Sequence, residues 1–242
     1  MAKRNPKQEG SNVWDCKPQC GPCPLNCNQC FYNRPDAFYV DINKPHIPTP
    51  EEVGDGIVRF NSGHDSNLEK EKVLEVAKQY KDVFFNTAIP RFDFPAPVVF
   101  TANRAEEQQA TLPIRDEAWL DKLMFVRLRV STTNLRWIDE AVGEWTANKI
   151  PVVLTFMAYY DDPPGKENYE WKVRHINSYW CAKKDFIISV LKREKEIGGR
   201  LVTMCGTPDS NWCKDCKNCE TYYWQAKKRM ESYNGNRNNT KV

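Results

Sequence analysis

Met124-Phe-Val-Arg-Leu-Arg-Val-Ser131 and Pro151-Val-Val-Leu-Thr-Phe-Met157 are two mostly apolar runs of strand length. Runs of this kind predict β-strands that are buried on both faces of a sheet. An apolar stripe at helical spacing between them predicts an amphipathic helix, with Ile138, Ala141, Val142 and Trp145 on one face. Two such strands joined by a helix are typical of a parallel pair, so this unit predicts an α/β fold.

The same pattern continues on both sides of this unit. Further strands are predicted at residues 56–61, 82–87, 97–103 and 200–204. Helices are predicted from Pro50, behind a capping box at Ser66-Asn-Leu-Glu69, and from about residue 178 to the stop signal Gly198-Gly199. We expect an open or partial (β/α) barrel of the TIM type with about six parallel strands, because eight full units usually need about 250 residues.

Length and composition limit the kinds of protein that this chain can be. It has 242 residues, 40% hydrophobic and 12% aromatic, which is enough for the core of one α/β domain or two small ones. The formal net charge of +3 is small and the Lys and Arg residues are spread out, so nucleic acid is not indicated as a partner. The first residues lack the apolar region of a secretory signal, and the longest apolar run, residues 151–160, is too short to span a bilayer. We therefore expect a soluble, cytoplasmic protein with no membrane partner.

Cysteine is unusually frequent, with ten residues. In a reducing compartment this frequency indicates metal or cluster ligation rather than disulfide bonds. Nine of the ten fall into two groups, at residues 16–30 and 205–219. The other, Cys181, lies in a stretch predicted to be helical and is interpreted as a small buried hydrophobic residue.

The first group contains the spacing C-x3-C-x2-C at Cys23, Cys27 and Cys30, followed directly by Phe31-Tyr32. Three cysteines so spaced can hold three irons of a [4Fe–4S] cluster and leave the fourth iron without a protein ligand. A zinc site is the alternative, but the C-x2-C pairs lie only three residues apart, whereas zinc ribbons usually separate them by a dozen or more. Cys16 and Cys20 begin an overlapping copy of the spacing without the aromatic residues, and their role stays open.

The second group offers four thiol ligands. Its C-x2-C-x2-C run is the spacing that bacterial ferredoxins use for a [4Fe–4S] cluster, and four ligands would close the site. Zinc with four thiolates is the competing interpretation. The ligands in either case are Cys205, Cys213, Cys216 and Cys219.

The cysteine spacing and its trailing aromatic residues resemble the signature of the radical SAM enzymes. The resemblance extends to the strands at 97–103 and 125–131 and to the following helix and strand, and it covers roughly residues 23–205. In that family the open iron binds S-adenosylmethionine (SAM), and one electron cleaves SAM to a 5′-deoxyadenosyl radical, which abstracts hydrogen from a substrate. The resemblance implies this activity here, with an electron donor such as flavodoxin or ferredoxin as partner and with a substrate that no motif identifies. Members with an additional C-terminal cluster also exist, which implies a second [4Fe–4S] cluster at the C-terminal cysteines.

The resemblance also assigns SAM contacts. The family's Gly-Gly-Glu-type turn after the second strand is replaced here by residues 61–65. Gly63 would allow a close approach of the backbone, and Ser62, His64 and Asp65 would supply polar contacts. Arg129 and Ser131, at the end of a predicted strand, are expected at the SAM carboxylate and ribose.

The expected organisation has three parts. Residues 1–13 are predicted as a flexible arm, 14–204 as a partial barrel like that of radical SAM enzymes, and 205–242 as a C-terminal cysteine cluster with a helix and a polar tail. One alternative is a non-catalytic module in which both cysteine groups hold structural zinc or iron–sulfur clusters. Another is a radical SAM activase or modifier of a protein or RNA that docks its substrate on residues 222–229, which an amphipathic packing helix explains equally well.

Overall fold

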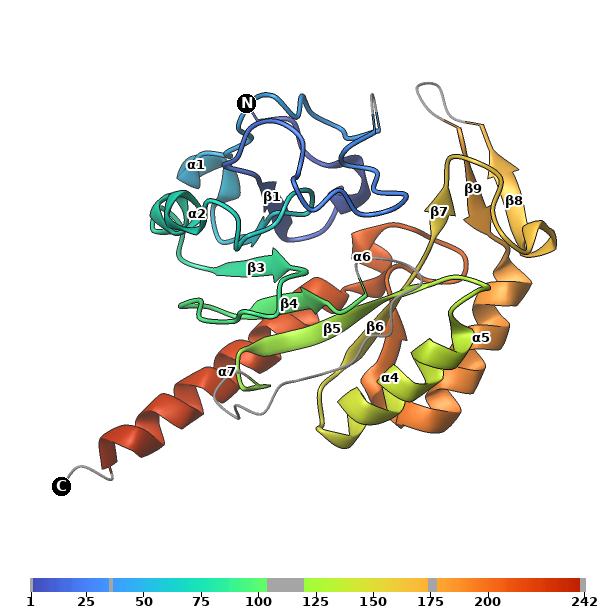
Figure 1. Ribbon diagram of the computed structural model, residues 1–242. Coiled ribbons are helices and arrows are strands. Elements are labelled where there is room, and N and C mark those ends of the chain that lie inside the picture. The colour runs from blue at the N-terminus through green and yellow to red at the C-terminus, as the bar shows by residue number, and fades with distance from the viewer. Residues whose placement is uncertain (1, 35–36, 104–119, 174–177, 240–242) are drawn as a thin grey trace.

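A parallel β-sheet of seven strands forms the centre of the molecule (Figure 1). The computed structural model describes residues 2–34, 37–103, 120–173 and 178–239, and the side chains of the last range as far as Ser232. Every neighbouring pair of strands is parallel, and the order across the sheet follows the order along the chain. The strands, in that order, are β1 (Val13–Cys16), β2 (Ile57–Phe60), β3 (Val83–Thr87), β4 (Val98–Thr101), β5 (Leu123–Val130), β6 (Val152–Phe156) and β10 (Val202–Met204).

This sheet confirms the predicted α/β class and all six predicted strands. It also contains β1, a strand that the sequence analysis missed. Because β1 and β10 are edge strands, the sheet is open and does not close into a TIM barrel. The carboxyl ends of parallel strands lie on one side of a sheet, so the segments that follow them share an edge.

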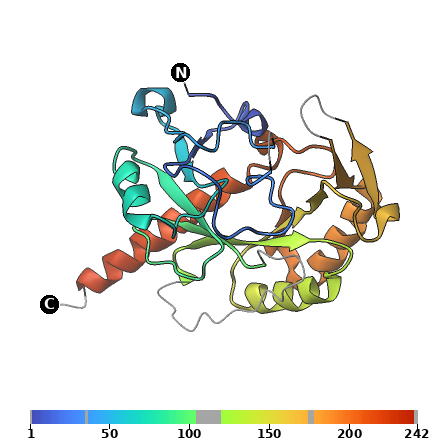
Figure 2. The same cartoon turned by 45° about the horizontal axis from the view of Figure 1, so that its top comes forward.

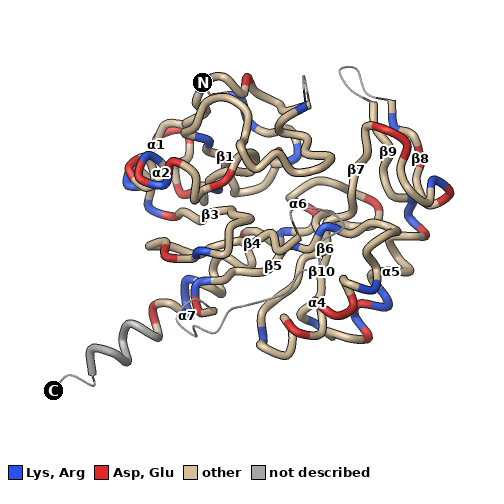
Figure 3. The backbone as a smooth tube through the Cα atoms, in the orientation of Figure 1, with Lys and Arg blue, Asp and Glu red and all other residues tan. Residues whose placement is uncertain are grey.

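Three helices cover one face of the sheet, which we call the outer face. They are α2 (Lys70–Ala77), α4 (Leu135–Ala147) and α5 (Lys184–Gly198). Alternate strand residues and one stripe of each helix form a single apolar core there, as the strand period of two requires. The helical stripe predicted between β5 and β6 is confirmed, and its Trp145 is fully buried. Both α4 and α5 carry basic as well as acidic side chains, so neither helix presents a single sign of charge (Figure 3).

The opposite, inner face is covered by the C-terminal helix α7 (Asn218–Asn239), which runs along the sheet (Figure 1). Tyr222, Tyr223 and Ala226 pack against side chains from six of the strands. The Tyr223 hydroxyl and the Lys227 ammonium group both donate hydrogen bonds to the carboxylate of Asp82, at 2.9 and 2.6 Å. Residues 222–229 therefore belong to a packing helix, although Trp224 stays 44% exposed.

A second, antiparallel sheet of three strands stands beside the carboxyl end of β6. It is formed by β7 (Ala158–Tyr159), β8 (Tyr169–Lys172) and β9 (Tyr179–Ala182) in the order β7-β9-β8. The predicted helix from residue 178 was wrong over its first turns, because this stretch is β9 and α5 starts at Lys184. Cys181 therefore lies on a strand and is half-buried.

The N-terminal residues also differ from the prediction. Gln8 is fully buried and donates a hydrogen bond of 2.9 Å to Asp15 on β1, within a segment expected to be a flexible arm. A capping box does form, but at Thr49 and Glu52 of the short helix α1 (Pro50–Val53). The box predicted at Ser66 is absent, since α2 begins four residues later without a side-chain cap.

None of the helices in the described part of the chain is both long enough and apolar enough to cross a membrane.

Candidate functional site

The first cysteine group lies on the segment between β1 and α1, at the carboxyl edge of the sheet. In Figures 1 and 2 this blue segment lies over the sheet on the side away from α4. Cys23 is buried, Cys27 and Cys30 are half-buried, and Cys20 is exposed. Two tight turns, closed by hydrogen bonds of 3.2 Å from Asn26 N to Cys23 O and from Cys30 N to Cys27 O, join the three cysteines of the C-x3-C-x2-C spacing.

A buried lysine closes the base of this cysteine segment. The ammonium group of Lys17 donates hydrogen bonds to the carbonyl oxygens of Gln19, Ile42 and Lys44, at 2.7, 3.0 and 2.7 Å. Burial lowers the pKa of Lys17, and the three carbonyl oxygens use its full donor capacity. The sequence analysis missed this residue, since a lone lysine after a short strand carries no signal of burial.

The second aromatic residue after the motif joins the cysteine segment to the turn after β2. Tyr32 is fully buried, and its hydroxyl donates a hydrogen bond of 3.0 Å to the carbonyl oxygen of Gly21. A Cβ atom at Gly63 would lie 2.1 Å from the Tyr32 ring, so only glycine fits there. The ring of His64 meets Tyr32 edge-on with centroids 5.9 Å apart. The structure thus brings the predicted turn at residues 61–65 against the predicted cysteine loop.

One ring nitrogen of His64 stays available in this turn. Its Nδ1 atom is buried and has no hydrogen-bond partner among the described residues. Burial lowers the pKa of His64, so the imidazole is neutral at pH 7. A buried ring nitrogen without a partner is costly unless a ligand or water satisfies it.

Ser62 and Asp65 have structural contacts instead. The Ser62 hydroxyl donates a hydrogen bond of 2.9 Å to Asp15. The Asp65 carboxylate accepts hydrogen bonds from Thr87 Oγ1 and from the backbone N–H of Ala88, at 2.9 and 2.6 Å. Burial raises the pKa of Asp65, and these contacts tie the turn after β2 to the end of β3.

Arg129, on β5, reaches the cysteine loop from the other side. Its guanidinium group donates a hydrogen bond of 2.7 Å to the carbonyl oxygen of Asn28, between Cys27 and Cys30. Ser131 follows at the carboxyl end of the same strand, fully buried, with its hydroxyl 2.8 Å from that of Thr133. Arg129 therefore lies at the loop, whereas the contacts of Ser131 are local.

The cysteine loop has a further contact at residues 159–162. Arg34 forms an ion pair of 2.7 Å with Asp161, and the Gln29 side chain accepts a hydrogen bond of 3.1 Å from the backbone N–H of Tyr160. Segments after β1, β2, β5 and β6 thus meet at the carboxyl edge of the sheet, where the parallel direction of the strands places them.

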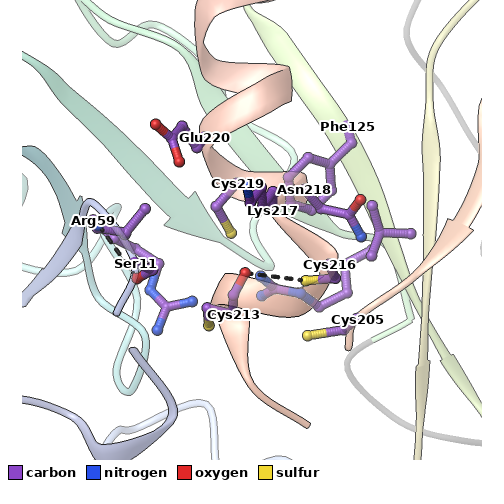
Figure 4. Close-up of a pocket in the computed structure, with 13 residues that line it drawn as sticks. Ser11, Arg59, Phe125, Cys205, Cys213, Cys216, Lys217, Asn218, Cys219 and Glu220 are labelled. Atoms are coloured by element: carbon purple, nitrogen blue, oxygen red, sulfur yellow. Dashed lines mark hydrogen bonds between the residues drawn. The ribbon is translucent and has the colours of Figure 1, made fainter. Parts of the chain in front are cut away.

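The second cysteine group lies on the inner face of the sheet. Cys205 directly follows β10, Cys213 and Cys216 begin and end the short helix α6 (Cys213–Cys216), and Cys219 lies in the first turn of α7. All four line one pocket, and Figure 4 shows them around it. Burial raises the pKa of the Cys213 thiol to about 12 and that of Cys23 in the first group to about 11.

Two arginines from different strands face the same pocket. Arg59 on β2 is paired with Asp15 on β1 at 2.6 Å, and this carboxylate outweighs burial and raises the pKa of Arg59. Arg127 on β5 lines the pocket as well, and burial lowers its pKa. Sequence reasoning missed both residues, because only the sheet brings them to the C-terminal cysteines.

Within the described residues, the two cysteine groups do not form a compact site for a single metal ion. In the described ranges, no three His, Cys, Asp or Glu side chains are grouped closely enough to hold a single metal ion.

Comparison with known proteins gives no family model, no curated protein and no solved structure that matches this chain.

Proposed function

We propose that the protein is a radical SAM enzyme, which reductively cleaves SAM and uses the 5′-deoxyadenosyl radical to abstract hydrogen from a substrate. The observation that carries the proposal is the position of the C-x3-C-x2-C loop. It follows β1 at the carboxyl edge of a parallel sheet, where catalytic sites of such folds lie. Tyr32, Gly63 and Arg129 hold it against the segments after β2 and β5.

The strand order supports a partial barrel as the finer description of the fold. Neighbouring strands of the sheet are in the order of the sequence, so each strand is added on the same side of the previous one, as in a closed (β/α) barrel. In this open sheet α7 covers the inner face, so the substrate would enter at the carboxyl edge, beside the cysteine loop.

The first group has the thiol ligands that a [4Fe–4S] cluster requires. Cys23, Cys27 and Cys30 would hold it, because thiolates are the ligands that such clusters take and turns join the three residues. When bound, the cluster supplies the electron that cleaves SAM and an iron that SAM can ligate.

The chain itself would position and shield SAM. The Nδ1 atom of His64, buried without a partner among the described residues, would accept or donate a hydrogen bond to it. Gly63 and the peptide groups beside it offer close backbone approach next to Tyr32. Arg129, already at the loop, would place a positive charge near a carboxylate. Ser131 would contribute from the end of β5, whereas Ser62 and Asp65 would act by holding the turn in place.

The second group would hold an auxiliary [4Fe–4S] cluster, with zinc as the competing metal. Cys205, Cys213, Cys216 and Cys219 line one pocket, beside the positive charge of Arg127. Four thiolates around either metal carry a net negative charge, which this environment favours. An external one-electron donor such as flavodoxin or ferredoxin would reduce the enzyme.

The experiment that tests the proposal is low-temperature EPR of protein that is reconstituted with iron and sulfide without oxygen and reduced with dithionite. We expect a [4Fe–4S]⁺ signal whose shape changes when SAM is added. Cys27→Ala should abolish this change, whereas Cys20→Ala, in the same loop but outside the spacing, should retain it. A signal that ignores SAM, or zinc in place of iron, would leave a non-catalytic metal-binding module.

A further inference from the structure

The two arginines that face the C-terminal cysteines differ in their counter-charges. Arg59 is 12% exposed at its side chain and forms an ion pair of 2.6 Å with Asp15. Arg127 lines the same pocket, and within the described ranges no Asp or Glu forms an ion pair with it. One positive charge beside the four thiols is therefore balanced by the protein, and the other is not.

An unbalanced guanidinium group in a pocket is costly unless an anion lies nearby. The thiols of Cys205, Cys219 and Cys213 are the groups whose ionised forms would attract it. Thiols become thiolates when they bind a metal, and the resulting centre is anionic. A reduced iron–sulfur centre carries one more negative charge than the oxidised one, so a nearby cation favours the reduced form.

Strand β5 also places Arg127 close to the first cysteine group. Arg127 and Arg129 are two residues apart and project on the same side of the strand, so their Cα atoms lie about 6.6 Å apart. Arg129 contacts the cysteine loop at Asn28, whereas Arg127 contacts the pocket of the second group. Asp15 makes a second link, because it binds both Arg59 at the pocket and Ser62 in the turn at residues 61–65.

We propose that Arg127 is the counter-charge of a redox-active iron–sulfur centre held by the four C-terminal cysteines, and that its charge raises the reduction potential of that centre. This inference rests on the auxiliary cluster of the proposed function. Arg127 is a positioning residue here: it does not ligate iron but stabilises the state that has gained one electron. The electron comes from a low-potential donor of the ferredoxin class, which is oxidised by one electron, and no bond to Arg127 forms or breaks.

The test is an EPR-monitored redox titration of the full reconstituted chain, with Arg127→Gln as the neutral variant and Arg127→Lys as the variant that keeps the charge. At a fixed potential, Arg127→Gln should lower the ratio of reduced to oxidised C-terminal centre about tenfold, which is a shift of about 59 mV for a one-electron couple. Arg127→Lys should retain most of the wild-type potential. The inference is overturned if Arg127→Gln has the wild-type reduction potential. It is also overturned if Arg127→Lys lowers the potential as much as Arg127→Gln does.

A second variant keeps the test informative if Arg127→Gln does not fold. Asp15→Asn removes the counter-charge of Arg59 and should shift the potential of the same centre upwards, opposite to Arg127→Gln. Zinc or no metal at the C-terminal cysteines, with a SAM-dependent signal intact, overturns the inference and leaves the loop site standing. A normal C-terminal titration without any response to SAM instead overturns the proposed enzyme activity.

Discussion

The two cysteine groups of this protein are built in different ways. The N-terminal group lies on a long segment at the edge of the sheet, with side chains that range from buried to exposed and with contacts from several segments. The C-terminal group lies at the junction of β10, α6 and α7, against the inner face of the sheet, and all four cysteines line one pocket.

Under the proposed function, this difference would give one fold both an open and a closed metal site. The N-terminal group has three cysteines in its motif and a neighbouring polar atom, His64 Nδ1, without a partner among the described residues. In the proposed enzyme, this group would hold the centre that accepts a small molecule. The C-terminal group surrounds its pocket with four thiols and positive charge, which suits a centre with a complete set of protein ligands.

The largest expected effect comes from removing the ligands of each cysteine group separately, because each removal should abolish one metal centre and leave the other. Cys23→Ala/Cys30→Ala should abolish the EPR response to SAM and leave the C-terminal centre, whereas Cys213→Ala/Cys216→Ala should do the reverse. Each pair should lower the bound iron from about eight to about four atoms per chain, because each cluster holds four. Iron analysis and EPR of the same samples measure this. Loss of both EPR signals in either double variant would contradict the independence of the two cysteine groups.

Lys17→Met should destabilise the segment that carries the N-terminal cysteines and leave the C-terminal group unchanged. It leaves three buried carbonyl oxygens without their donor, and we expect the free energy of unfolding to fall by about 3 kcal/mol. Lys44→Met, in the same segment but with a side chain that is 79% exposed, is the matched control and should change little. Urea unfolding of the metal-free protein measures both, and equal losses would contradict the role of Lys17.

Gly63→Ala should displace Tyr32 and loosen the contact between the cysteine loop and the turn after β2. The new Cβ atom would lie 2.1 Å from the Tyr32 ring, so we expect a loss of about 1–3 kcal/mol. Gly143→Ala, in α4 with its nearest neighbour at 3.8 Å, should instead stabilise the protein by up to about 1 kcal/mol. Thermal unfolding of the two variants should therefore shift in opposite directions.

The smallest expected effect concerns the anchor of α7 beneath the C-terminal group. Burial raises the pKa of Asp82, but the hydrogen bonds from Lys227 and Tyr223 outweigh it, and the net pKa is lowered. Asp82 therefore contributes stability above its unfolded pKa of about 3.9, and that stability is lost as the pH falls through the lower folded pKa. Asp82→Asn should cost about 1 kcal/mol at pH 7.

The pH dependence separates this anchor from a general charge effect. The difference in unfolding free energy between the wild type and Asp82→Asn should shrink as the pH falls below 4, because the wild-type carboxylate is then protonated. Asp55→Asn, on a residue for which we expect no such anchor, serves as the control. A constant difference from pH 7 to pH 3 would show that Asp82 does not act through its charge.

Much of the sheet could be predicted from the sequence, because its strands are long apolar runs that differ clearly from the amphipathic helices. Strand β1 could not, since Val13-Trp-Asp-Cys16 includes a buried aspartate that is stabilised by Arg59 and Ser62, which are distant in the sequence. Strand β9 was hidden because it runs into α5 with no glycine or proline between them. The capping box at Ser66 failed because Ser66 is buried, with its hydroxyl accepting a hydrogen bond from Asn61.

The candidate site, like the sheet, could be predicted only in part. That the segments after several strands meet at one edge was predictable from their order, and the contacts of Tyr32, Gly63 and Arg129 agree with it. Lys17, Arg59 and Arg127 were not predictable, because each acts on residues that are distant in the sequence. Their roles depend on where the tertiary structure places their positive charges, which the sequence alone does not reveal.

The position of α7 has a consequence for the order in which the molecule is made. This helix covers side chains from β1 through β6, yet it follows all of them along the chain. On the ribosome, the inner face of those strands therefore stays uncovered until Tyr222, Tyr223 and Ala226 have left the exit tunnel. Cys219 emerges just before them, so the last ligand of the proposed C-terminal metal centre and the cover of the nascent sheet become available within the same short interval of synthesis.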